Sequence, residues 1–98
     1  MKIEQNLQLC KLFDAYGALL SQSQRDVLGD YLLFDLTGSE IAENKNISRQ
    51  AVKDSVNKAI KKLEKLEKSL HFVEKIDKIT EELQDVKNQL SLSKRREK

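Results

Sequence analysis

The apolar positions in the first third of the chain fall at helical spacing. From about residue 22 to 34 this spacing predicts a helix whose inner face is made of Val27, Leu28, Tyr31, Leu32 and Phe34. An earlier helix, over residues 4–19, is predicted because apolar residues recur there at steps of three and four. The positions that form its wide apolar face are Leu7, Leu9, Cys10, Leu12, Phe13, Tyr16, Leu19 and Leu20.

Two capping-box signals mark helix starts in the middle of the chain. In this motif a Ser or Thr and a Glu or Gln three residues later each accept a hydrogen bond from the other residue's backbone amide. The two pairs are Ser21 with Gln24 and Thr37 with Glu40. The second pair predicts a short third helix that carries Ile41 and Ala42 inward.

A tight turn and a fourth helix are predicted next. Asn44 or Asn46 can adopt the left-handed conformation that ends a helix, and Ser48 can cap the helix that follows. The inner stripe of this fourth helix is predicted to contain Ala51, Val52, Val56, Ala59 and Leu63. A capped short helix, a turn of three to four residues and a second capped helix together predict a helix-turn-helix.

The last third of the chain changes to a narrower apolar stripe. Its members are Leu63, Leu66, Leu70, Val73, Ile76, Ile79, Leu83, Val86 and Leu90. These steps are nearly those of a heptad seam, with a phase slip of one residue between Val73 and Ile79. The slip, together with residues 68–72, indicates a bend or break at that point.

Two arrangements are open for this stripe, because it is too long for a four-helix core of this size to cover. The arm either folds back on the first helix or pairs with another chain, and we favour self-association into a homodimer. The predicted interface consists of Leu70, Val73, Ile76, Ile79, Leu83, Val86 and Leu90. The predicted division is a helix-turn-helix domain over residues 1–68 and a C-terminal helical arm over residues 69–98.

Composition agrees with an all-α fold of about four helices plus the arm. The 98 residues include no proline and three glycines, and 35% of them are charged. The lone cysteine, Cys10, cannot form an internal disulfide and is typical of a reducing cytosol. No apolar run approaches the roughly 18 residues of a membrane span, and no signal-peptide pattern opens the chain. We therefore expect a cytoplasmic protein.

The net charge of +2 conceals an asymmetry. Residues 1–47 carry four basic and seven acidic side chains, whereas residues 48–98 carry 14 of the 18 basic and nine of the 16 acidic ones. The second half is therefore the part expected to meet a polyanion, and a nucleic-acid partner is predicted.

The predicted recognition helix, which starts at Ser48, carries the candidate nucleic-acid contacts. In a helix-turn-helix the second helix enters the major groove with its N-terminal residues leading. The side chains expected to reach base edges are those of Arg49, Gln50, Lys53 and Asn57. The side chains expected to contact phosphates are those of Lys58, Lys61, Lys62 and Lys65. Asp54 opposes phosphate binding, and we expect it to pair with Lys58 along the helix.

No catalytic or metal site is predicted. His71 is the only histidine, and no cysteine or histidine cluster accompanies it. A glycine-rich phosphate loop and a Ser-His-Asp arrangement are also missing from the sequence. We therefore expect neither enzymatic activity nor a cofactor.

The stretch from Thr37 to Leu63 resembles region 4 of bacterial sigma factors. The matching positions are Thr37, Glu40, Ile41, Ala42, Ile47, Ser48, Arg49, Ala59 and Leu63. A closer resemblance, over about residues 7–70, is to the YlxM family of small bacterial proteins. It is carried by "LFDAYGALLSQSQRDVL" (12–28) and "LTGSEIAENKNISRQAVKDSVNKA" (36–59). Lys53 stands where that family often has tyrosine, so this chain is more basic there.

The resemblance implies a sigma-region-4-like fold and a link to the signal recognition particle pathway. The pathway link rests on the family's gene neighbourhood, and the implied role is a regulatory one that touches the particle's RNA or protein. Two functions therefore compete. One is a module that binds DNA or the particle's RNA. The other is a protein-interaction adaptor that acts through the C-terminal helix without nucleic-acid binding.

Overall fold

The described chain is almost entirely helical, as the sequence predicts. The computed structural model describes the backbone of residues 3–96 and the side chains of residues 6–93. Its helices are α1 (Ile3–Tyr16), α2 (Gln22–Leu33), α3 (Gly38–Lys45), α4 (Arg49–Leu70) and α5 (Phe72–Arg96), with a 3-10 turn, η1 (Gly17–Leu19), after α1. The predicted all-α, helix-turn-helix class is confirmed.

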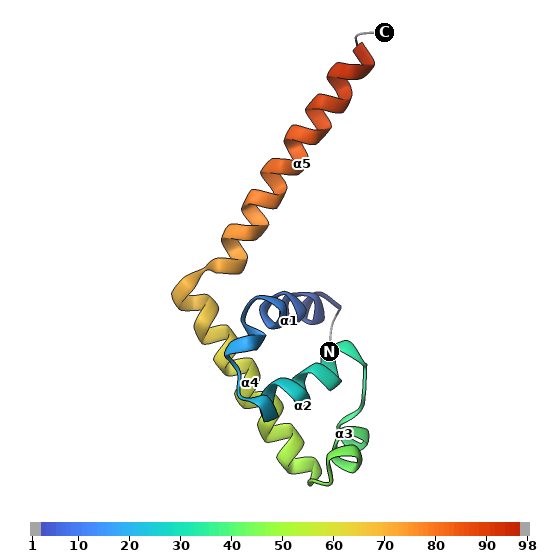
Figure 1. Cartoon of the computed structure of the whole chain (residues 1–98), viewed down its shortest axis with the longest axis vertical. Helices are drawn as coiled ribbons and strands as arrows, with labels where there is room; N and C mark the ends of the chain where they lie inside the picture. Colours follow the sequence, from blue (N-terminus) through green and yellow to red (C-terminus); the bar gives the residue numbers. More distant parts are fainter. Residues whose placement is uncertain (1–2, 97–98) are drawn as a thin grey trace.

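Helices α1 to α4 pack together, and α5 projects from them as a straight rod (Figure 1). The principal extents are 64 × 28 × 21 Å and the radius of gyration is 18.4 Å. A compact domain of this length would have a radius of gyration of about 13 Å. Of the elements that the structure describes, α1 makes the main contact with α5, and beyond that contact the rod has no neighbour in this chain.

Both predicted capping boxes are present. The Ser21 hydroxyl accepts a hydrogen bond from the Gln24 amide at 3.2 Å, and the Gln24 side chain accepts one from the Ser21 amide at 3.4 Å. The corresponding distances between Thr37 and Glu40 are both 3.1 Å. Each pair satisfies two backbone donors that would otherwise be unpaired at a helix start. The first residues of α2 and α3 are thereby fixed by local chemistry.

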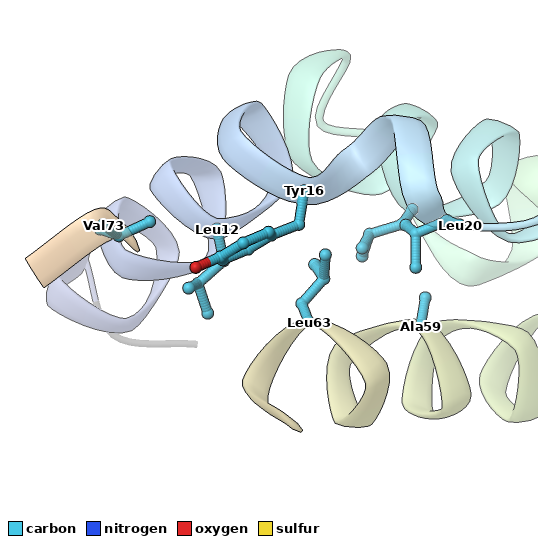
Figure 2. Packing of buried hydrophobic residues seen from close by; sticks show 7 residues of the cluster. Leu12, Tyr16, Leu20, Ala59, Leu63 and Val73 are labelled. Atoms are coloured by element: carbon cyan, nitrogen blue, oxygen red, sulfur yellow. The ribbon is translucent and has the colours of Figure 1, made fainter. Parts of the chain in front are cut away.

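The core consists of two adjoining clusters that meet on α4. The larger cluster joins α1 to the second half of α4, where Leu63 and Ala59 point toward Tyr16 and Leu20 (Figure 2). The buried members of the smaller cluster, which holds the helix-turn-helix together, are Val27, Ile41, Ala42 and Val52. Tyr31 and Val56 pack against both clusters, so the two form one continuous interior.

Four residues predicted on apolar or inner faces are exposed, and two of them, Leu7 (60%) and Leu19 (55%), belong to the predicted face of the first helix. Phe34 is 69% exposed because α2 ends at Leu33, and Phe34, in the cap position, no longer follows the helical stripe. Ala51 is exposed because the neighbouring Val52, only 3% exposed, takes the inward direction. Consecutive helical residues point about 100° apart, so both cannot face the same narrow core.

The predicted break in residues 68–72 is confirmed at His71. This residue has left-handed backbone angles (φ 52°, ψ 31°), and its amide donates to the Glu67 carbonyl at 2.7 Å. The break changes two members of the predicted seam. Leu70 ends α4 and therefore lies on a different helix from the rest of the stripe. Val73 is only 4% exposed and belongs to the larger core cluster with Leu12 and Tyr16, as Figure 2 shows.

The Glu67 carboxylate caps the start of α5 and so holds the elbow between α4 and α5. Its two oxygens accept hydrogen bonds from the amides of Val73 and Glu74, each at 3.0 Å. The Tyr16 hydroxyl donates to the same carboxylate at 2.6 Å and accepts from the Phe72 amide at 3.1 Å. The first three amides of α5 are therefore satisfied by two side chains from α4 and α1. The negative carboxylate also complements the positive end of the helix dipole.

This network shifts the pKa of both side chains. Burial favours the neutral form of Glu67, but the hydrogen bonds from Tyr16, Val73 and Glu74 outweigh it and lower the pKa of the carboxyl below its usual 4.5. Burial, and then the hydrogen bond to Glu67, raises the pKa of the Tyr16 hydroxyl above 10.0. The arrangement therefore requires an ionised Glu67 and a protonated Tyr16.

We expect Glu67→Gln to lower the melting temperature at neutral pH by about 5 °C, because the uncharged amide has a single acceptor oxygen and cannot accept all three bonds. The folded pKa of Glu67 lies below its unfolded value. Its contribution is therefore complete above pH 4.5 and is lost as pH falls through the folded pKa. The difference in melting temperature between wild type and Glu67→Gln should therefore become smaller in acid. Glu64→Gln, an exposed change on the same helix, is the matched control. If the difference in melting temperature does not change with pH, the ionised Glu67 carboxylate is not what stabilises the elbow.

A second prediction concerns Gly29, which is buried in the interior of α2. A Cβ at this position would lie 3.5 Å from Phe13 Cζ, an ordinary van der Waals contact. Glycine costs a helix interior roughly 1 kcal/mol relative to alanine. We therefore expect Gly29→Ala to raise the melting temperature by about 4 °C. Gly29→Val should lose that gain, because its extra methyl groups would press against the Phe13 ring. A lower melting temperature for the alanine variant would contradict this account.

Candidate nucleic-acid interface

The turn between α3 and α4 is built by backbone hydrogen bonds. Asn46 has left-handed angles (φ 55°, ψ 47°), so the structure chooses Asn46 over Asn44. Its amide donates to the Glu43 carbonyl at 3.3 Å, and the Ile47 amide donates to the Ala42 carbonyl at 3.0 Å. These bonds form a Schellman motif, in which the last carbonyls of a helix are satisfied as the chain reverses. The link between α3 and α4 therefore needs only three residues, 46–48.

Two further contacts hold this helix-turn-helix in shape. The Ser48 hydroxyl accepts a hydrogen bond from the Ala51 amide at 3.0 Å, which confirms Ser48 as the cap of α4. Lys45 at the end of α3 lies with its Nζ 3.6 Å from Oδ2 of Asp30 on α2. This ion pair ties the turn to the helix behind it. The sequence carries no local signal for it, since the partners lie on different helices.

The rotation of α4 is set by the residues that it buries. Val52, Ala59 and Leu63 are 3%, 0% and 0% exposed and lie along one side of the helix. In a helix with 3.6 residues per turn, burying that side directs the opposite side outward. The outward side is the one on which the candidate nucleic-acid contacts were predicted.

Every predicted contact residue on α4 is exposed. These residues are Arg49, Gln50, Lys53, Asn57, Lys58, Lys61, Lys62 and Lys65. Four of them, Lys53, Asn57, Lys61 and Lys65, follow at steps of four and form a line along the helix. Arg49 and Gln50 occupy its first turn. Figure 1 shows that this end of α4, beside α3, lies at the opposite end of the molecule from the tip of α5. No described element covers these residues.

Asp54 has a different partner from the one predicted. Its Oδ1 accepts a hydrogen bond from the Gln50 side-chain amide at 2.9 Å, and the described ion pairs do not include one with Lys58. The bond holds the Gln50 side chain along the helix surface and leaves its Oε1 and second N–H available. Asp54 can therefore orient a neighbouring polar side chain rather than neutralise a lysine.

Positive charge is concentrated on α4. This helix carries seven basic and three acidic residues, and one of the acidic side chains, Glu67, is engaged at the elbow. Residues 72–93 of α5 carry three basic and five acidic ones. Residues 94–96 at the end of α5 are also basic, so the comparison concerns residues 72–93, and a polyanion is attracted to α4 rather than to that part of the rod.

The described surface also carries an open groove and an exposed histidine. An open groove of about 630 Å³ runs between α1 and α4, with Leu9, Leu12 and Ile60 among its lining residues. His71 at the elbow is exposed, and its Nδ1 lies 3.0 Å from Oε2 of Glu74. Among the described residues, no three potential metal ligands come together. No described helix has both the length and the apolar character needed to cross a membrane.

Comparison with known proteins shows where the chain belongs. Residues 3–98 match the model of the family UPF0122, described as "Putative helix-turn-helix protein, YlxM / p13 like". A UPF0122 protein of Fusobacterium nucleatum subsp. nucleatum is 36% identical over 87 residues, which is 89% of this chain and 84% of the relative. A UPF0122 protein of Halalkalibacterium halodurans is 38% identical over 85 residues, 87% of this chain and 78% of the relative. The helix-turn-helix that this description names is the motif formed here by α3 and α4. The chain therefore belongs to the UPF0122 family of YlxM / p13-like proteins, as its sequence resemblance indicates.

Proposed function

We propose that this chain is a regulatory nucleic-acid-binding protein that presents the first turns of α4 to its ligand. The observation that carries the proposal is that Arg49, Gln50, Lys53 and Asn57, in the first turns of α4, are all exposed. The first turns of α4, which carry these residues, lie at the opposite end of the molecule from the tip of α5 (Figure 1), so the rod leaves the approach open. The buried line of α4 fixes the rotation of these turns without help from a ligand.

The exposed side chains at the start of α4 are suited to reading bases. Arg49 and Lys53 can donate to the O6 and N7 atoms of guanine. Gln50 and Asn57 can pair with adenine through one donor and one acceptor. The hydrogen bond from Gln50 to Asp54 uses one N–H of the Gln50 amide, and the groups needed for adenine remain. Base reading therefore belongs to the N-terminal half of α4 in this proposal.

The lysines farther along α4 are suited to phosphate contacts. Lys58, Lys61, Lys62 and Lys65 are all exposed, and the last of them lies about 24 Å along the helix axis from Arg49. The major groove is about 12 Å wide, so these residues extend past the base edges toward the backbone. Phosphate contacts supply affinity that falls as salt rises.

Duplex DNA is the ligand that we favour. The major groove of B-form DNA admits an α-helix, whereas that of A-form RNA is too narrow for side chains to read. RNA would have to be bound at a loop, a bulge or the backbone. The YlxM resemblance makes the RNA of the signal recognition particle the alternative ligand, and the particle's protein a candidate partner. Both would place the chain in the cytoplasm, as the lone Cys10 also suggests.

A second function is favoured by the exposed apolar residues of α5. In that case the helix-turn-helix is a scaffold, and the chain is an adaptor whose α5 binds a protein. A cell that carries Arg49→Ala with Lys53→Ala would then behave as wild type. A cell that carries charged residues at Leu83 and Val86 would lose the function.

We expect Arg49→Ala with Lys53→Ala to weaken binding to a mixed-sequence DNA duplex by at least about tenfold. Changing Lys61 and Lys65 to alanine should reduce the salt slope of the binding constant by about two, because two phosphate contacts are lost. Fluorescence anisotropy at about 50 and about 200 mM salt would measure both effects. The RNA of the signal recognition particle, tested in parallel, would distinguish the two ligands.

The matched control removes two positive charges from α5. Lys75 and Lys78 are exposed there, and changing both to alanine should leave binding nearly unchanged. Binding that did not weaken with salt would contradict the phosphate contacts. If the α4 and α5 variants lose DNA affinity equally, only the net charge of the protein matters. The assignment of the DNA contacts to α4 would then be wrong.

A further inference from the structure

One face of α5 carries an unbroken line of exposed apolar side chains. Its members, with their exposed fractions, are Ile76 (42%), Ile79 (55%), Leu83 (58%), Val86 (52%) and Leu90 (58%). They follow at steps of three, four, three and four, with Phe72, 49% exposed, four residues before the first. We call these six residues the α5 stripe. Within the described chain, α1 lies beside the first two residues of the stripe, Phe72 and Ile76, and leaves the stripe open from Ile79 onward.

In the structure, the apolar line of α5 does not have the phase slip that was predicted from the sequence. The slip arose from counting Val73 in the same line as Ile79, but Val73 faces the core. Phe72 takes its place, because Phe72 and Ile76 are one helical step of four apart. The α5 stripe is therefore a regular heptad seam, with Ile76, Leu83 and Leu90 at one core position and Phe72, Ile79 and Val86 at the other.

We propose that a second copy of this chain covers the α5 stripe, as a parallel two-stranded coiled coil. The seam is self-complementary, since equal core positions face each other when two parallel helices pair in register. The flanking charges also agree. Glu82 and Lys87 are exposed beside the seam, at positions that approach each other across a parallel pair. Each copy would thus place its Glu82 near Lys87 of the other copy.

The antiparallel alternative is less favourable on charge. The antiparallel register that pairs all six residues of the α5 stripe sets Ile79 opposite Leu83 and brings the two copies of Glu82 together. Like charges at that position oppose pairing. The parallel register has no such like-charge pair among the flanking residues that the structure describes. Charge therefore selects the orientation, and the apolar stripe supplies the attraction.

A parallel dimer would bring the two α1–α4 units to the same end of the coiled coil. The outward side of α4 would stay open, because its first turns lie away from α5 (Figure 1). The seam from Ile76 to Leu90 is only about 21 Å long, so the dimer is expected to dissociate on dilution. A monomer could also bind nucleic acid, so dimerisation stands or falls separately from the proposed function.

Sedimentation equilibrium of the full chain tests self-association. We expect wild type to reach the dimer mass as concentration rises, and Leu83→Glu with Val86→Glu to remain monomeric. The matched control, Gln84→Glu with Asn88→Glu, adds the same charge to exposed positions off the seam and should remain dimeric. Circular dichroism would verify that all three are helical. A monomeric wild type, an unaffected seam variant, or equal loss in both variants would overturn the proposal.

Disulfide formation tests the orientation. In a background with Cys10→Ser, we expect Leu83→Cys to form a covalent dimer on oxidation, because equal core positions in a parallel pair lie within disulfide reach. Gln84→Cys, one residue off the seam, should not form one. If sedimentation shows a dimer but the Leu83→Cys variant does not cross-link, the parallel arrangement would be overturned.

Discussion

The buried line of α4 is the constraint on which the rest of the structure depends. Three other helices, α1, α2 and α3, pack against this one helix, and they do so through Val52, Ala59 and Leu63. Ala59 is fully buried, and its small side chain lets the neighbouring helices approach closely. Because a helix is rigid, fixing one line of side chains fixes all the others. The outward direction of Lys53 and Asn57 is therefore a consequence of apolar packing on the opposite side.

The second constraint is polar and acts at the elbow. Without a partner, the first amides of α5 would be unpaired beside the core, at a cost comparable to a lost hydrogen bond each. Glu67 of α4 and Tyr16 of α1 accept hydrogen bonds from these amides and so remove that cost. The direction of α5 is therefore tied to both α4 and α1. Val73 then closes the end of the core. The rod is thus fixed by a few hydrogen bonds, one buried side chain and the ion pair between Lys11 of α1 and Asp77 of α5, whose Nζ and Oδ2 lie 3.2 Å apart.

The features that the sequence predicted correctly depend on neighbours within a few residues. The capping boxes at Ser21 and Thr37, the cap at Ser48 and the break before Phe72 are all of this kind. The capping residues contribute chemistry that requires no knowledge of the fold. Their local character explains why the helices and the helix-turn-helix could be recognised, and why the exposed residues of α4 were largely identified.

The features that the sequence missed depend on tertiary contacts. Whether Ala51 or Val52 faces inward is decided by how α3 packs, and whether Val73 belongs to the core or the stripe is decided by where α5 starts. Glu67 accepts a hydrogen bond from Tyr16, a residue 51 positions away in the sequence. No periodic pattern in the sequence distinguishes this glutamate from the others in the lysine-rich helix. The ion pair between Lys45 and Asp30 was missed for the same reason.

These two constraints place two unlike surfaces at opposite ends of one molecule. The positive side of α4 is suited to a polyanion, and the α5 stripe is suited to an apolar partner. Had α5 continued the line of α4 without a break, the seam from Ile76 onward would have been one residue out of phase with the apolar line of α4. The left-handed residue His71 and the carboxylate of Glu67 therefore do more than end one helix and begin another. They bury Val73 in the core and set the direction of α5, so that the arm carries its apolar stripe as a surface separate from the domain.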